Sequence, residues 1–130
     1  MSTIKSFEDI EAWKLARELS QEIFELTLMG SFAADYGLRD QINRSTGSIM
    51  DNIAEGFERG GSREFIHYLS LARGSAGEVR SQLCRAFDRK YLENDKYLEV
   101  MENLTKVSKM ITWLISYSRD SNLKGYKFQV

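Results

Sequence analysis

The sequence contains no proline, and it has a single cysteine and a single histidine among 130 residues. Without proline, no residue forces a helix to stop. The lone Cys84 cannot form an internal disulfide, which fits a reducing compartment. No apolar run approaches the roughly 20 residues that span a bilayer, and the first residues lack the apolar core of a signal peptide. We therefore expect a cytoplasmic protein without a membrane partner.

The residues that are present favour one helical domain. Hydrophobic residues make up 42% of the chain and charged residues 28%, with abundant Glu, Lys, Arg, Leu and Ala. The length suits a single domain over residues 1–130 with a core of its own. A formal net charge of -1 argues against a protein that coats nucleic acid by bulk charge alone.

Hydrophobic periodicity predicts four helices and no strand. We expect them at about 8–29, 37–58, 63–90 and 95–117, with a loop at 30–35 and a tail at 122–130 that is mobile or docked on a neighbour. The third helix gives the clearest pattern, because its apolar residues step by 4 and 3 without a break. They are Phe65, Leu69, Ala72, Ala76, Val79, Leu83 and Ala86. Short loops favour antiparallel neighbours, so the fold class predicted is all-α, an up-down-up-down four-helix bundle.

The third helix carries a second, small-residue stripe away from its apolar line: Ser70, Gly74, Gly77 and Ser81. Each glycine inside a helix is about 1 kcal/mol less favourable than alanine. Small residues in a row would offset that cost if they let another helix come close. That helix could belong to the same bundle or to another subunit, and both readings stand at this point.

The second helix carries a polar stripe about 120° from its apolar line. Its members are Gln41, Arg44, Ser48, Asn52, Glu55 and Arg59. One interpretation is an ordinary solvated face. The other is a site or a polar interface, because amides, hydroxyls and paired charges suit hydrogen-bonded contact.

Charge is unevenly distributed along the chain. Residues 1–35 hold three basic and seven acidic side chains, whereas residues 36–90 hold nine basic and seven acidic ones. Arginine binds phosphate through two parallel hydrogen bonds and stacks on bases. We therefore predict that Arg44, Arg59, Arg63, Arg73 and Arg80 contact nucleic acid. The alternative is that they form salt bridges within the chain, to Glu55, Glu58, Glu64 and Glu78.

Catalytic patterns are few. Glu64 and His67 form a single E-x-x-H pair, whereas a di-iron bundle needs two such pairs and two more carboxylates. Arg63 and His67 could suggest a helical HEPN-type ribonuclease, although those enzymes usually space the two residues more widely. Cys84 has no flanking base to activate its thiol. We expect no enzyme activity, metal, cofactor or small-molecule substrate.

Two segments resemble a known family. They are Gln41 to Arg44, and the run Ser-Ile-Met-Asp-Asn-Ile-Ala-Glu-Gly from Ser48 to Gly56. Further matching pieces are Phe7 to Ile10, Trp13 to Ala16, Glu64-Phe65, Ala72 to Ser75, and Glu78. Together they resemble the bacterial four-helix bundle proteins also called the 23S rRNA intervening-sequence or S23 family. The chain departs from that pattern at Ser31 to Ala34, where the family often has a proline, and at Ser45, where it often has an alanine.

The resemblance implies an up-down bundle that forms homopentameric rings with a central channel and has no enzymatic activity. A related branch, the accessory protein of diversity-generating retroelements, is a basic pentamer that binds a reverse transcriptase and nucleic acid. The expectation is therefore a non-catalytic, homo-oligomeric, RNA- or ribosome-associated binding protein. Two other classes stay open: a protein-protein assembly module without nucleic-acid binding, and a ribonuclease that uses Arg63 and His67.

Overall fold

The computed structural model describes residues 4–120, and all regular structure within them is helical. The predicted all-α class is therefore confirmed for this part of the chain. The elements are η1 (Phe7–Asp9), α1 (Glu11–Leu26), α2 (Gly30–Ala34), α3 (Tyr36–Glu58), α4 (Ser62–Asp88) and α5 (Asn94–Asp120). The predicted tail at 122–130 lies outside the described residues. None of the helices in residues 4–120 is long and apolar enough to cross a membrane.

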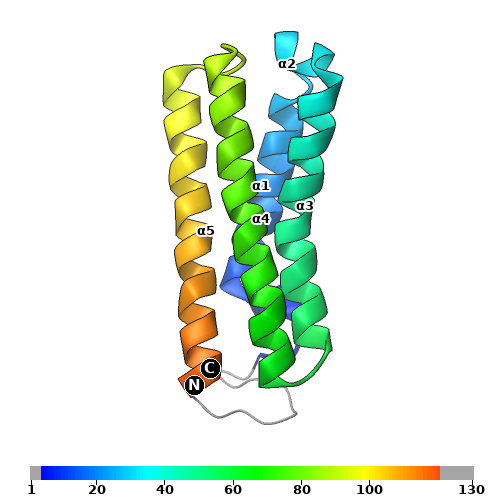
Figure 1. Cartoon of the computed structure of the whole chain (residues 1–130), viewed down its shortest axis with the longest axis vertical. Helices are drawn as coiled ribbons and strands as arrows, with labels where there is room; N and C mark the ends of the chain where they lie inside the picture. The colour runs from blue at the N-terminus through cyan, green and yellow to red at the C-terminus, as the bar shows by residue number, and fades with distance from the viewer. Residues whose placement is uncertain (1–3, 121–130) are drawn as a thin grey trace.

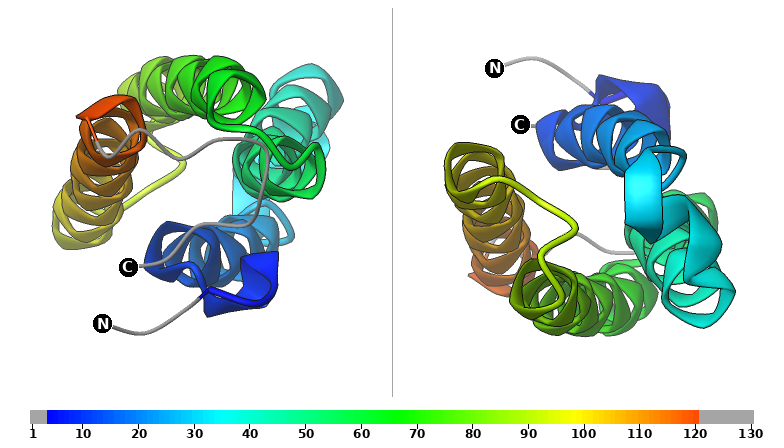
Figure 2. Two further views of the ribbon diagram at one scale, coloured as in Figure 1. Left: turned by 90° about the horizontal axis from the view of Figure 1, so that it is seen from below. Right: turned by 90° about the horizontal axis from the view of Figure 1, so that it is seen from above.

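The long helices pack side by side as a helical bundle (Figure 1). Helix α3 packs on α4, α4 packs on α5, and α1 lies against both α3 and α5. Seen along its long axis in Figure 2, the bundle surrounds one core. The apolar line predicted for the third helix, from Phe65 to Ala86, is buried over its whole length in α4. Its unbroken 4-3 spacing keeps these seven side chains on one face.

The prediction of one continuous first helix is wrong, because Ile10 separates η1 from α1. Ile10 has an extended backbone (φ -79°, ψ 121°) and a side chain that is only 2% exposed. The backbone N–H groups of Lys5 and Ser6 donate to Asp9 Oδ2 at 3.0 and 3.2 Å, which closes the short η1 turn. The chain therefore bends before α1 begins and lays Ile10 into the core.

The predicted loop at 30–35 is also wrong, since most of it forms α2. Its Phe32 is buried and stacks on Tyr91, with ring centroids 5.2 Å apart. Burial of one aromatic side chain on the end of the bundle accounts for order in this segment. The fourth predicted helix, expected at about 95–117, runs as α5 from 94 to 120, and its buried face includes Val100 and Val107.

Asp35 ties α3 to the loop between α4 and α5. One carboxylate oxygen accepts from the backbone N–H of Leu38 at 3.3 Å and caps α3. The other accepts from Tyr91 Oη at 2.8 Å and Arg89 Nη1 at 2.7 Å. The Tyr91 hydroxyl, then the Leu38 amide and Arg89, hold the pKa of Asp35 below its ordinary value of 3.8. One charged side chain thus joins segments more than 50 residues apart.

Asp35→Asn should destabilise the protein at neutral pH and much less in acid. A carboxyl whose pKa is depressed by folding contributes stability above its unfolded pKa, and this contribution is lost as pH falls through the folded pKa. The gap in urea-unfolding free energy between wild type and Asp35→Asn is therefore expected to be full at pH 7. It should shrink as pH falls through about 4 and below, since 3.8 is the ordinary value. Asp51→Asn is the matched control, because Asp51 is exposed and has no hydrogen bond among the described residues. A gap for Asp35→Asn that stays constant with pH would show that this carboxylate is not what stabilises the tie.

Candidate functional site

The polar stripe on α3 is divided between solvent and α4, so each interpretation holds for part of it. Its two middle residues, Ser48 and Asn52, are half-buried, and the other four are exposed. Ser48 Oγ lies 3.0 Å from Ser75 Oγ, and Gln41 Oε1 accepts from Arg85 Nη2 at 2.7 Å. Asn52 donates to the carbonyl and hydroxyl oxygens of Ser48 at 2.8 and 2.9 Å. Small hydroxyl and amide side chains here let two helices meet through hydrogen bonds rather than through bulky apolar contact.

Gly56 ends this polar seam at a point where the two helices nearly touch. It is buried, and a Cβ placed on it would lie 2.6 Å from the Cβ of Tyr68 on α4. That neighbouring atom is fixed to its own backbone, so a side chain at residue 56 has no room. The run from Ser48 to Gly56 thus packs α3 on α4; its structural role is close contact between helices.

Among residues 4–120, Arg59 is the one predicted nucleic-acid contact that forms carboxylate pairs. Its Nη2 lies 2.9 Å from Glu55 Oε2, its Nη1 lies 4.0 Å from Glu64 Oε2, and its guanidinium covers the Tyr68 ring at 5.1 Å. The Glu55 hydrogen bond is the main reason that the pKa of Arg59 is raised. The salt-bridge alternative therefore holds for Arg59, but within residues 4–120 neither Glu58 nor Glu78 pairs with any of the five arginines.

Arg73 and Arg80 lie on one side of α4, and Arg73 reaches α5 from there. Arg73 Nη1 donates to Thr112 Oγ1 on α5 at 3.2 Å. Arg80 is seven residues further along α4, so it sits about 10 Å away on the same side. Its charge lowers the pKa of Tyr97 on α5, against larger effects that raise it, chiefly the Cys84 hydrogen bond. Both guanidinium groups are exposed, and neither pairs with a carboxylate in residues 4–120.

One lysine on α5 extends this surface, and sequence reasoning missed it. Lys109 is exposed and lines a shallow groove with Thr105, Lys106 and Glu102. Lys109 lies between Thr105 and Thr112 on the helix, so it shares the face that α5 turns toward Arg73. We call Arg73, Arg80 and Lys109 the α4–α5 basic strip.

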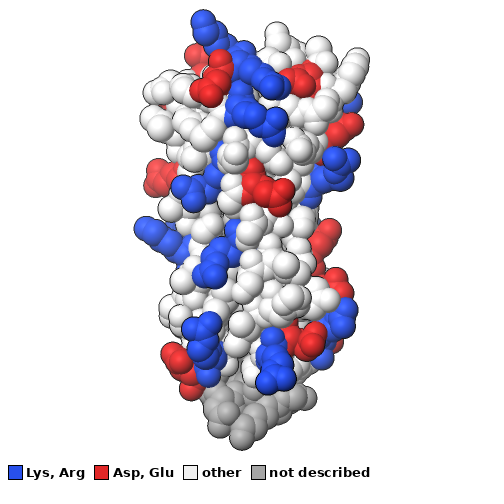
Figure 3. Space-filling model, viewed as in Figure 1, with Lys and Arg blue, Asp and Glu red and all other residues white. Residues whose placement is uncertain are grey.

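The remaining predicted arginines lie elsewhere. Arg44 is exposed on α3, and Arg63 is exposed in the first turn of α4, about 15 Å along the helix from Arg73. Figure 3 shows basic side chains recurring along the face over α4 and α5, with acidic side chains between them. The structure therefore brings two of the five predicted contacts, Arg73 and Arg80, into one strip. It places the other three apart from that strip.

The small-residue stripe lies on the outer surface of α4. Ser70, Gly74, Gly77 and Ser81 are all exposed. A Cβ added at Gly74 or Gly77 would meet nothing within 4 Å. Close packing within the same bundle is therefore the wrong reading of this stripe. The small-residue stripe is open to solvent, and Leu71 beside it is 45% exposed.

Arg63 and His67 are exposed and four residues apart on α4, and His67 sets its ring edge against Tyr68 at 5.2 Å. Cys84 is half-buried, with its Sγ 3.2 Å from Tyr97 Oη. Among the described residues, no three His, Cys, Asp or Glu side chains are grouped to hold a metal ion. His67 and Cys84 thus lie about 25 Å apart along α4.

Sequence comparison identifies the family. The 23S rRNA-intervening sequence protein family matches residues 8–113, and the chain belongs to it. A crystal structure of a protein of unknown function from the S23 ribosomal protein family of Bacteroides thetaiotaomicron shares the fold, with a TM-score of 0.75. It is 22% identical and covers 81% of this chain and 95% of its own. No curated protein matches the chain. The family description names no reaction, and the neighbour has no known function.

Proposed function

We propose that the protein is a non-catalytic, RNA- or ribosome-associated binding protein that works as a homo-oligomer, with a pentamer as the expected form. The observation that supports RNA binding best is the α4–α5 basic strip. Its two arginines are exposed and lack carboxylate partners in residues 4–120, so their charge and hydrogen-bond donors are available to phosphate. Membership in a family named after 23S rRNA points the same way.

An up-down-up-down order of the four long helices is part of this proposal. Contacts between neighbours support it, because residues late in one helix meet residues early in the next. Thr27 meets Asn43, and Ser48 meets Ser75 whereas Gln41 meets Arg85. Cys84 meets Tyr97 whereas Arg73 meets Thr112, so α4 and α5 pair in the same antiparallel sense.

The subunit contact in this proposal is the small-residue stripe of α4. The two exposed glycines and two serines have side chains that project little from α4, which would let a helix of a second copy approach closely. A ring of copies would also repeat the α4–α5 basic strip around its circumference and so raise the local positive potential above that of one chain with net charge -1.

The logarithm of the RNA-binding constant should fall linearly with the logarithm of the salt concentration. Each phosphate contact adds about 0.7 to the slope for a single strand. Replacing both strip arginines, as in Arg73→Glu/Arg80→Glu, is therefore expected to lower the slope by about 1.4. Fluorescence anisotropy of a labelled single-stranded RNA across a KCl series measures it. Arg17→Glu/Arg119→Glu makes the same change in net charge on exposed residues outside the strip and should leave the slope nearly unchanged.

The outcomes separate the competing classes. Equal losses in both double variants would mean that net charge, not the strip, drives binding. Weak binding that does not depend on salt would favour the second candidate, an assembly module without nucleic acid; the acidic side chains scattered over the same face support that class. RNA cleavage by the wild type that is lost in His67→Ala would instead support the ribonuclease hypothesis.

A further inference from the structure

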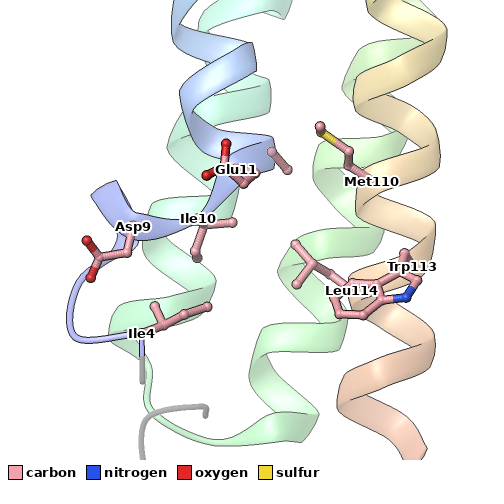
Figure 4. A pocket seen from close by; sticks show the side chains of 8 residues that line it. Ile4, Asp9, Ile10, Glu11, Met110, Trp113 and Leu114 are labelled. Atoms are coloured by element: carbon pink, nitrogen blue, oxygen red, sulfur yellow. The ribbon is translucent and has the colours of Figure 1, made fainter. Parts of the chain in front are cut away.

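An apolar groove of about 320 Å³ opens between the start of α1 and the second half of α5 (Figure 4). Ile4, Ile10, Met110 and Leu114 line it, so its surface is almost entirely hydrocarbon. Trp113 forms part of the wall and is 58% exposed, with its indole ring stacked on Tyr117 at 5.2 Å. Large apolar surface left open to water beside a groove is a common mark of a binding site.

The rim of the groove is acidic. Asp9 and Glu11 both line it, and both are exposed; Glu11 is paired with Lys14 at 3.3 Å, and one oxygen of Asp9 accepts the two backbone N–H groups described above. They belong to the acidic N-terminal part of the chain, where residues 1–35 carry seven acidic and three basic side chains. An occupant that combines apolar side chains with positive charge would therefore complement this groove. A second copy that docked groove to groove would bring two acidic rims together, which is unfavourable.

Residues 121–130 have the matching composition. They contain Leu123, Tyr126, Phe128 and Val130, two lysines at 124 and 127, and no acidic residue. Tyr126, Phe128 and Val130 alternate with polar residues, so an extended chain would present them on one side. These residues also lie beyond the family match, which ends at residue 113.

Residues 121–130 follow the end of α5, which is close enough to the groove for the segment to reach it. Helix α5 ends at Asp120, six residues or about 9 Å past Leu114. Ten extended residues span about 33 Å. The segment can therefore turn back along α5 and run through the groove of its own chain without leaving the end of the bundle at which α1 begins and α5 ends (Figure 1).

We infer that residues 121–130 dock in the α1–α5 groove of the same chain. Tyr126 and Phe128 fill the hydrocarbon floor beside Trp113, and Lys124 and Lys127 meet the rim of Asp9 and Glu11. This docking covers the exposed apolar wall of α5. It is independent of RNA binding, because the groove lies outside the α4–α5 basic strip.

Disulfide trapping tests the contact in the full chain. In a Cys84→Ser background, Met110→Cys is combined with Val130→Cys, on the groove-facing side of the segment, and mildly oxidised at low protein concentration. The control combines Lys109→Cys with Val130→Cys. Lys109 is on the same turn of α5, at equal reach from Asp120, but about 100° away from the groove. Non-reducing gels separate an internal bond from a bond between two chains.

An internal bond that forms about tenfold faster from residue 110 than from residue 109 is expected, since a disulfide requires Cβ atoms about 4 Å apart. Adding Lys124→Glu/Lys127→Glu should slow it at low salt. Equal rates at the two positions would overturn the docking. Bonds only between chains would also overturn it, in favour of exchange with a second copy.

A second readout needs no cysteine in the groove. In Trp13→Phe, Trp113 is the sole tryptophan. Tyr126→Ser/Phe128→Ser should then raise acrylamide quenching of Trp113 about twofold, as burial of about half the exposed ring is lost. Unchanged quenching would contradict contact with the indole ring. Neither assay contains nucleic acid, so their failure and a failure of RNA binding are distinguishable.

Discussion

Gly56→Ala is expected to lower the free energy of unfolding by about 1–3 kcal/mol, the usual cost of overpacking a core. The new Cβ would lie 2.6 Å from the Tyr68 Cβ and 3.2 Å from a ring carbon of Phe65. The Tyr68 atom cannot rotate away, because it is joined directly to the α4 backbone. Either α3 or α4 must shift, and the hydrogen bond between Ser48 and Ser75 would lengthen with it.

Gly47→Ala on the same helix is the matched control and should have the opposite sign. A Cβ there would meet nothing within 4 Å. The substitution should then stabilise the protein by about 1 kcal/mol, the difference in helix propensity between the two residues. Urea denaturation of both variants measures the pair. If Gly56→Ala is as stable as Gly47→Ala, α3 and α4 do not approach as closely as this packing requires.

Gly74→Leu is expected to break the proposed oligomer and leave the protomer folded. The residue is exposed, and added atoms meet nothing within the chain. Leucine also forms helix better than glycine, by about 0.8 kcal/mol. The stability of the single chain should therefore rise slightly. A helix from a second copy, however, could no longer pack closely on the small-residue stripe.

Light scattering measures the result directly. Wild type should have several times the mass of one 15.0 kDa chain at micromolar concentration, and Gly74→Leu should approach the mass of one chain. Ser116→Leu places the same side chain on exposed α5, outside the stripe, and should keep the wild-type mass. An unchanged mass for Gly74→Leu would remove the stripe from the interface. A monomeric wild type would defeat the ring itself.

The family motif shows how far a sequence pattern can be read. The Ser48 to Gly56 run was recognisable as a resemblance, and its spacing predicted a helix, but spacing could not say what the polar side chains contact. The same amide and hydroxyl residues suit water, a ligand or a neighbouring helix. Only the position of α4 decides this, since the partner of Ser48 is Ser75, 27 residues away. Gln82 and Arg85 of the same helix bond to Ser45 and Gln41, just before the run.

The α4–α5 basic strip could likewise be predicted only in part from the sequence. The α4 spacing placed Arg73 and Arg80 on one side of their helix, and Arg73 donates to Thr112 of α5 from that side. The sequence did not join them to Lys109, because pairing between helices depends on which faces meet. The α1–α5 groove was missed for the same reason. It is built from residues about 100 positions apart.

By itself, the sequence determined the helical class, the approximate helix limits and the buried line of α4. These follow from local propensity and from a 4-3 spacing that fixes one apolar face. Tertiary structure alone decided that Ile10 breaks the first helix, that 30–34 form α2, and that two residues of the α3 polar stripe, Gln41 and Ser48, bond to α4. It also decided that Gly74 and Gly77 face outward. Such features depend on the burial of side chains against distant segments, and no local pattern encodes which segment that is.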